Sequence, residues 1–123
     1  MIVDDDDVDT YLSKRVLSEN DFTRDVVTAS SVKEAIDYLS VHKNGFPEII
    51  FLDLNMPGQN GLDFLEAFNS LPETQKNSTR IILLMNVVNS TDNITSKATS
   101  HPLVYHIIEK PLTADKLGSI PAK

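Results

Sequence analysis

The sequence predicts an α/β fold, a doubly wound sheet of five parallel strands with helices on both faces. Short apolar runs alternate along the chain with stretches whose apolar residues recur at helical spacing, which is typical of a βα repeat. Two of the runs, 48–52 and 80–84, are apolar at nearly every position, as parallel strands covered on both faces usually are. The length of 123 residues suits one hydrophobic core, so we expect one domain over residues 1–123.

Five strands are expected, and right-handed helical crossovers would place them in one sheet. They fall at residues 1–3, 25–29, 48–52, 80–84 and 104–108. In a sheet of this kind a ligand binds beyond the carboxyl ends of the strands. The residues that directly follow the apolar runs are therefore the first candidates for a functional site.

Helices are expected between the strands. The first would carry Val8, Tyr11, Leu12 and Val16 on one face, and the second Val32, Ala35, Ile36 and Leu39. Ser31 with Glu34 predicts a capping box for the second helix. A third helix would follow Asn60 and Gly61, a fourth would span 92–100, and a fifth would run from 113 to 120. The polar segment 69–79 is the longest predicted loop.

The composition excludes several classes of protein. A net charge of −7 without a Lys/Arg cluster argues against nucleic-acid binding. The chain has no cysteine, which excludes disulfides and thiolate metal sites. No apolar run approaches the ~20 residues of a membrane helix, and no signal-peptide pattern opens the chain. We therefore expect a cytoplasmic protein that binds neither membranes nor nucleic acids.

Three charged features follow apolar runs that are predicted to be strands. The acidic run 4–7 follows the first strand, Asp53 ends the third, and Lys110 follows the fifth. Carboxylates brought together without a counterion would repel each other, by roughly 4 kcal/mol per pair at 4 Å and an effective dielectric of 20. Mg²⁺ relieves this repulsion, because it prefers oxygen ligands and keeps positions for water or phosphate. A lysine beside it suits a phosphate oxygen. The pattern indicates a site for magnesium and phosphoryl transfer.

Each feature taken alone has a simpler explanation. Four adjacent aspartates are more often a solvated acidic stretch, and an aspartate at the end of a strand often caps the next turn. Exposed lysines such as Lys110 are common. The site interpretation depends on the three features occurring together at one edge of the sheet.

The motifs also resemble those of a known family. Asp4-Asp5, the stretch from Asp53 to Gly58 with Gly61, and Lys110-Pro111 are similar to the motifs of receiver domains of bacterial response regulators. The resemblance covers nearly the whole chain and implies a CheY-like, flavodoxin-like sheet in the order 2-1-3-4-5. It also implies a cis bond between Lys110 and Pro111.

The resemblance implies a phosphorelay role with assigned residues. Asp53 would accept the phosphoryl group from phosphohistidine on a sensor histidine kinase or phosphotransfer protein. Asp4, Asp5, Asp53 and the Asn55 carbonyl would hold Mg²⁺, and Lys110 would pair with Asp53 and then with the phosphoryl group. The output would pass to a downstream protein target through protein contacts.

The chain departs from the family pattern near the phosphoryl position. The residues there are Met85, where receivers usually carry Thr or Ser, and Asn86, which could crowd the phosphate or donate through its amide. Ile107 stands where the family carries a switch aromatic, and Tyr105 could be a displaced one or an ordinary half-exposed strand tyrosine. A hydrogen bond to a charged group contributes about 1.5–3 kcal/mol, so its loss at Met85 would weaken the conformational response.

Two alternatives stay open. The chain could be a phosphorylation-independent interaction module on the same fold, which Met85 and Ile107 favour. It could also be a magnesium-dependent hydrolase with Asp53 as nucleophile, but such enzymes typically need an aspartate two residues later, where this chain has Asn55. We expect a signalling domain that is not a dedicated enzyme.

Overall fold

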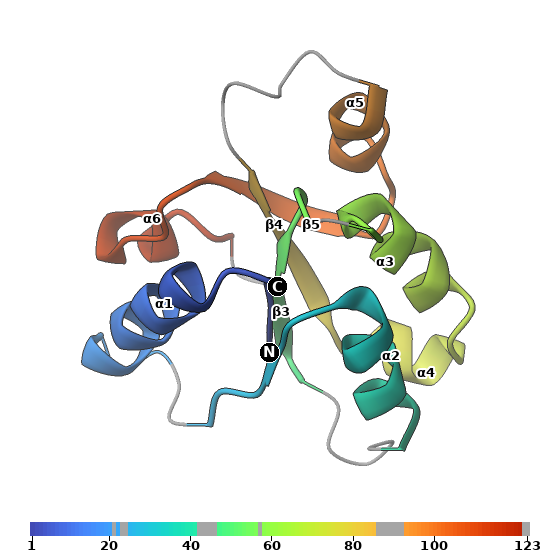
Figure 1. The fold of residues 1–123 in the computed structure, drawn as a ribbon, viewed down its shortest axis with the longest axis horizontal. Coiled ribbons are helices and arrows are strands. Elements are labelled where there is room, and N and C mark those ends of the chain that lie inside the picture. Colours follow the sequence, from blue (N-terminus) through green and yellow to red (C-terminus); the bar gives the residue numbers. More distant parts are fainter. Residues whose placement is uncertain (21, 23–24, 42–46, 57, 86–92, 122–123) are drawn as a thin grey trace.

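A parallel sheet in the order β2-β1-β3-β4-β5 forms the centre of the computed structural model (Figure 1). The structure describes residues 1–20, 22, 25–41, 47–56, 58–85 and 93–121. The strands are β1 (Ile2–Val3), β2 (Thr28–Ala29), β3 (Ile49–Asp53), β4 (Arg80–Met85) and β5 (Val104–Glu109). The predicted fold class and strand order are confirmed.

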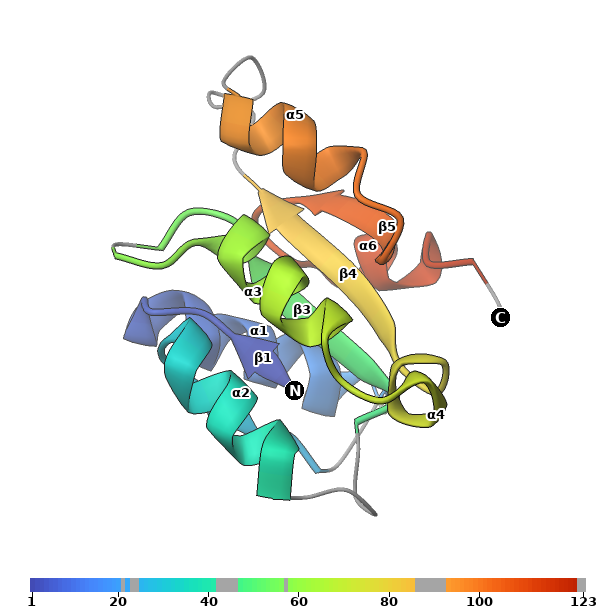
Figure 2. The same cartoon turned by 90° about the vertical axis from the view of Figure 1, so that its right-hand side faces the viewer.

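Helices cover both faces of the sheet. One face carries α2 (Val32–Val41), α3 (Gly61–Asn69) and α5 (Asn93–Thr99), which follow one another across the sheet in Figure 2. The other face carries α1 (Asp7–Glu19) and α6 (Ala114–Gly118) (Figure 1). Within the described ranges, no helix has the length and apolar character needed to cross a bilayer.

The strands are buried on both faces because their side chains alternate between two cores. Ile81 and Leu83 belong to the core beneath α2, α3 and α5, whereas Ile82 and Leu84 belong to the core beneath α1 and α6. Phe51 of β3 packs into the core beneath α1 and α6, whereas the residues directly before and after it pack into the core beneath α2, α3 and α5. This arrangement explains why the central runs are apolar at successive positions.

Two predicted boundaries are wrong. β2 has two residues rather than five, because it is an edge strand and its neighbour β1 offers only Ile2 and Val3 for pairing. The predicted loop 69–79 contains the short helix α4 (Glu73–Lys76), which begins after Pro72. The Pro72 carbonyl accepts from the N–H groups of Gln75 and Lys76. A single turn is too short for apolar periodicity to reveal it.

The face that α1 buries also differs from the apolar stripe in its sequence. The helix buries Ser13 and Leu17, while Val8, Tyr11 and Leu12 are exposed. The sheet therefore contacts the line of residues one position further along the sequence, which lies about 100° around the helix from the predicted stripe. Apolar periodicity identified the helix correctly but not its orientation.

Side-chain caps fix where two helices begin. The Ser31 hydroxyl accepts from the Glu34 N–H, as predicted, but the Glu34 carboxylate accepts from the N–H and hydroxyl of Ser30 rather than from Ser31. A complete capping box lies instead at α3, where Asn60 and Asp63 each accept the other's backbone N–H. This second box fixes the helix that follows the Asp53 loop.

Candidate functional site

Parallel strands bring the three charged features to one edge of the sheet. Asp4 directly follows β1, Asp53 is the last residue of β3, and Lys110 directly follows β5. The Lys110 N–H donates to the Met85 carbonyl at 2.9 Å, which fixes the lysine backbone beside the end of β4. The peptide bond between Lys110 and Pro111 is cis, as expected. The predicted convergence at the carboxyl edge is confirmed for these residues.

Three carboxylates at this edge could share one cation. Asp4, Asp5 and Asp53 each place one oxygen within 4.8 Å of the others. Asp4 and Asp53 are buried, at 3% and 2% exposure, whereas Asp5 is exposed. Oxygen donors of this kind, with one side open to solvent, fit a hard cation that keeps water or phosphate among its ligands. The residues therefore fit Mg²⁺.

Lys110 lies between three carboxylates. Its ammonium nitrogen is 3.1 Å from Asp9 Oδ2, 3.2 Å from Asp53 Oδ1 and 3.3 Å from Asp4 Oδ2. Burial lowers the pKa of Lys110, but the attraction of Asp53, Asp9 and Asp4 outweighs it and holds the pKa above its usual value. The ammonium group is therefore charged at neutral pH and balances part of the negative charge.

The environment of Asp53 opposes its ionisation. Burial is the largest cause and raises its pKa to about 6; Lys110 and the Asn55 N–H act in the opposite direction, and Asp4 adds to the rise. The Asn55 N–H donates to Asp53 Oδ1 at 3.2 Å. At neutral pH most of the carboxylate is still ionised, so a nucleophilic oxygen is present at a position where further positive charge would be favourable.

The acidic run divides into residues with different tasks. Asp4 Oδ1 accepts from the Asp6 N–H, and Asp6 in turn caps α1 by accepting from the N–H groups of Val8 and Asp9. Asp7 and Asp9 lie in the first turn of α1, where negative charge interacts favourably with the helix dipole and stabilises the helix. The run is thus neither a uniformly solvated stretch nor wholly a cation site.

The loop after β3 brings α3 close to Asp53. Gly58 has φ +81°, a left-handed conformation that favours glycine. A Cβ on Gly61 would lie 2.9 Å from Leu54 Cα, so the chain can approach this closely only with glycine there. Among the described atoms, the side-chain nitrogen of Asn55 is buried and has no hydrogen-bond partner.

The residues that depart from the family pattern lie at different places in the chain. Met85 is the half-buried last residue of β4, and Asn86 lies outside the described residues. Tyr105 alternates normally with Val104 and packs into the core beneath α1 and α6. A register shift between Ile81 and Ile82 then pairs Ile107 with Leu83, so Ile107 faces the other side of the sheet from Tyr105. Tyr105 is half-buried, as an ordinary strand tyrosine would be.

Asp9 is the site residue that sequence reasoning missed. Its carboxylate makes the shortest of the three Lys110 contacts, although it belongs to a helix rather than to a strand end. The available signal was its place in the first turn of α1, the helix that begins at the same edge of the sheet soon after β1.

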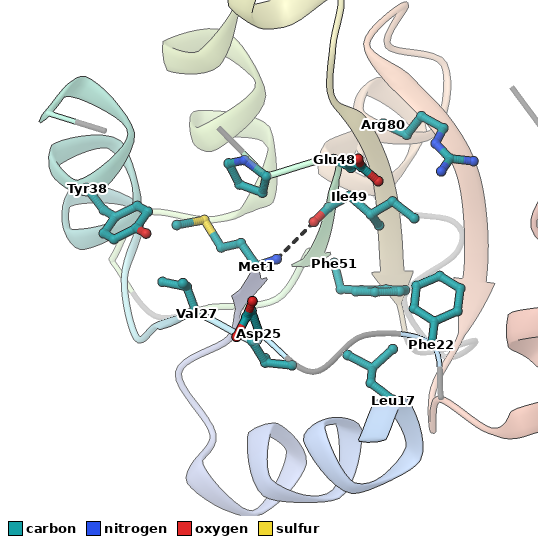
Figure 3. A pocket seen from close by; sticks show the side chains of 12 residues that line it. Met1, Leu17, Phe22, Asp25, Val27, Tyr38, Glu48, Ile49, Phe51 and Arg80 are labelled. Carbon is teal, nitrogen blue, oxygen red and sulfur yellow. Dashed lines mark hydrogen bonds between the residues drawn. The ribbon is translucent and has the colours of Figure 1, made fainter. Parts of the chain in front are cut away.

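A cavity of about 620 Å³ lies elsewhere (Figure 3). Its lining includes Leu17 near the end of α1 and Ile49 and Arg80, the first residues of β3 and β4. It therefore lies at the amino end of the strands, opposite Asp53. This cavity takes no part in the carboxylate site.

Comparisons with known proteins agree with the fold and with the motifs. The family model described as response regulator receiver domain matches residues 1–120. The chain is 29% identical to a two-component response regulator from Cytophaga hutchinsonii, with TM-score 0.82 and coverage of 97% of this chain and 90% of that one. It is 31% identical to a response regulator receiver protein from Dyadobacter fermentans DSM 18053, with TM-score 0.78 and coverage of 94% and 88%. A CheY-like receiver domain protein from Methanospirillum hungatei JF-1 is 29% identical, with TM-score 0.71 and coverage of 95% and 85%.

Proposed function

This chain belongs to the response regulator receiver domain family, and from that premise we propose that it accepts a phosphoryl group on Asp53 in a phosphorelay. Receiver domains are signalling modules rather than dedicated enzymes. The observation that carries the proposal is the buried Asp53 carboxylate, which has Lys110 at 3.2 Å and lies within 4.8 Å of two further carboxylates. A purely structural aspartate would not require this arrangement.

In the proposed reaction an Asp53 carboxylate oxygen attacks the phosphorus of phosphohistidine on a partner protein. The new O–P bond forms as the P–N bond breaks, and the electron pair leaves with the imidazole nitrogen, which takes a proton from solvent. Lys110 is placed to donate to the phosphoryl oxygens. Asp4, Asp5, Asp53 and the Asn55 carbonyl would hold Mg²⁺, which when bound supplies positive charge against the phosphoryl oxygens.

The partners follow from this chemistry. The donor would be a sensor histidine kinase or a histidine phosphotransfer protein, and the output a downstream protein target contacted by the phosphorylated domain. We propose a receiver domain over residues 1–123 that works in the cytoplasm, without nucleic acid or membrane binding of its own. The net charge of −7 is consistent with a domain that does not bind nucleic acid directly.

The proposal is tested with acetyl phosphate as a small phosphodonor. With Mg²⁺ we expect intact-mass spectrometry to detect one phosphoryl adduct. Hydroxylamine should remove it, because an acyl phosphate reacts with this nucleophile. Mg²⁺ at ten times its dissociation constant should also stabilise the fold by about 1.4 kcal/mol, measured by urea unfolding. The Asp5→Asn variant should need more Mg²⁺ for both effects. Absence of any adduct on the wild-type chain would contradict the proposal.

A second candidate, a phosphorylation-independent interaction module, is favoured by Met85 and by Ile107, which is 40% exposed. Methionine at the end of β4 offers no hydroxyl donor to a phosphoryl group. If the chain is a working switch with a weakened response, the Met85→Thr variant should enlarge the amide chemical-shift changes that beryllofluoride and Mg²⁺ cause in β4 and β5. If beryllofluoride changes neither the wild-type nor the variant spectrum, the second candidate gains support.

A further inference from the structure

We propose that Asp9 is a positioning residue that holds the Lys110 ammonium group beside Asp53. The Asp9 Oδ2–Lys110 Nζ distance of 3.1 Å is the shortest of the three carboxylate contacts of this lysine. An ammonium group has three N–H donors, and three carboxylates surround it. The inference rests on the proposed function, because it assigns Lys110 an anchor during phosphoryl transfer.

The backbone of Asp9 is fixed to the site by a chain of hydrogen bonds. Asp4 Oδ1 accepts from the Asp6 N–H at 2.9 Å, and Asp6 Oδ1 accepts from the Asp9 N–H at 3.0 Å. The first turn of α1 therefore begins at a defined place relative to Asp4. Its geometry brings the Asp9 carboxylate to the lysine from the helix side, whereas Asp4 and Asp53 approach it from the strand ends.

Asp9 differs from the other two partners in what else it can bind. Asp4 and Asp53 belong to the carboxylate group that could hold a cation, and Asp9 does not. A bound cation would draw the oxygens of Asp4 and Asp53 away from Lys110, because the divalent charge competes for them. Asp9, with a side chain 43% exposed, would remain available to the ammonium group. It is thus the partner that can stay with Lys110 once the site is loaded.

Space next to the lysine makes an anchor necessary. A groove of about 230 Å³ runs between α1 and the segment after β5, and Asp9, Ser13, Lys110 and Leu112 are among its lining residues. A four-carbon side chain with rotatable bonds can swing into such a space. The contact with Asp9 restricts this motion and keeps the ammonium group at 3.2 Å from Asp53.

The test compares Asp9→Ala and Asp9→Asn with the control Asp7→Ala. Asp7 lies in the same helical turn and is exposed, and within the described residues it makes no ion pair with Lys110. Asp7→Ala therefore controls for the loss of a negative charge from the first turn of α1. At saturating Mg²⁺ we expect Asp9→Ala to slow phosphorylation by acetyl phosphate about five- to tenfold. Asp9→Asn, whose amide oxygen still accepts from the ammonium group, and Asp7→Ala should stay within about twofold of the wild type.

A second measurement needs no phosphodonor. At saturating Mg²⁺, the ¹⁵N–¹H signal of the Lys110 ammonium group should be protected from exchange in the wild type and in Asp9→Asn, and should be lost in Asp9→Ala. The inference would be overturned if Asp9→Ala kept the wild-type phosphorylation rate and the wild-type ammonium signal. It would also be overturned if Asp9→Ala and Asp7→Ala slowed phosphorylation equally. If the wild type takes no phosphoryl group, the proposed function fails instead, and the ammonium signal still decides whether Asp9 holds the lysine.

Discussion

The Asp53→Asn variant is expected to lose all phosphorylation by acetyl phosphate and to unfold less readily than the wild type at neutral pH. The loss follows because an amide oxygen cannot replace the carboxylate nucleophile. The gain in stability follows because burial opposes the charge on Asp53 and raises its pKa to about 6. At pH 7 without Mg²⁺ the variant should be more stable by about 1–3 kcal/mol, measured by urea unfolding.

The pH dependence of this stability difference has a defined sign. The pKa of Asp53 rises from 3.8 in the unfolded chain to about 6 in the folded one, so the folded state binds the proton more tightly. The resulting stabilisation is fully present below pH 3.8 and is lost as the pH rises through about 6. The wild type should therefore lose stability relative to Asp53→Asn between pH 4 and 7. A difference that is independent of pH in this range would contradict the assignment.

Mg²⁺ should reduce this difference in stability. A cation at the three carboxylates offsets their repulsion in the wild type, whereas Asp53→Asn lacks one charged ligand. Saturating Mg²⁺ at pH 7 should therefore stabilise the wild type more than the variant. Equal stabilisation of both proteins would place the cation away from Asp53.

The strand ends and the charged residues that follow them could be predicted because both signals are local. The apolar run before Asp53 marks a strand covered on both faces, and the charged residue ends it at the sheet edge. Parallel pairing then places the residues that follow these strands at one edge, and the order β2-β1-β3-β4-β5 brings Asp4, Asp53 and Lys110 together. The fold class and the convergence of these residues depend only on this logic.

Other features depend on contacts that the local sequence does not encode. That Tyr105 and Ile107 face opposite sides of the sheet depends on a register shift in the pairing of β5 with β4. The exposure of Tyr11 and Leu12 depends on how α1 is rotated against the sheet. Asp9 resembles any acidic residue of a first helical turn until the helix is placed beside Lys110. Each of these is set by packing between distant segments.

The Lys110→Met variant is expected to lose about 3 kcal/mol of stability at pH 7 without Mg²⁺. Methionine keeps the apolar stem of the side chain but removes the positive charge between three carboxylates. Two of them, on Asp4 and Asp53, have side chains only 1% and 3% exposed, so water cannot compensate. Urea unfolding measures the loss, and Mg²⁺ should restore part of it because the cation supplies the missing positive charge.

Lys33→Met is the matched control, because it removes a lysine whose ion pair is short but exposed. It therefore separates the effect of burial from the effect of the N–O distance. Lys33 Nζ lies 2.7 Å from Asp37 Oδ2, which is shorter than any Lys110 contact, but the two side chains are 80% and 64% exposed. Exposed ion pairs within a helix contribute about 0.3–0.5 kcal/mol, so this variant should be nearly as stable as the wild type. If both lysine variants lose the same small amount, the Lys110 cluster is solvated in solution and burial does not strengthen its ion pairs. A large loss confined to Lys110→Met, reduced by Mg²⁺, is the expected result, since only there does removal of the ammonium group leave buried carboxylates without a counterion.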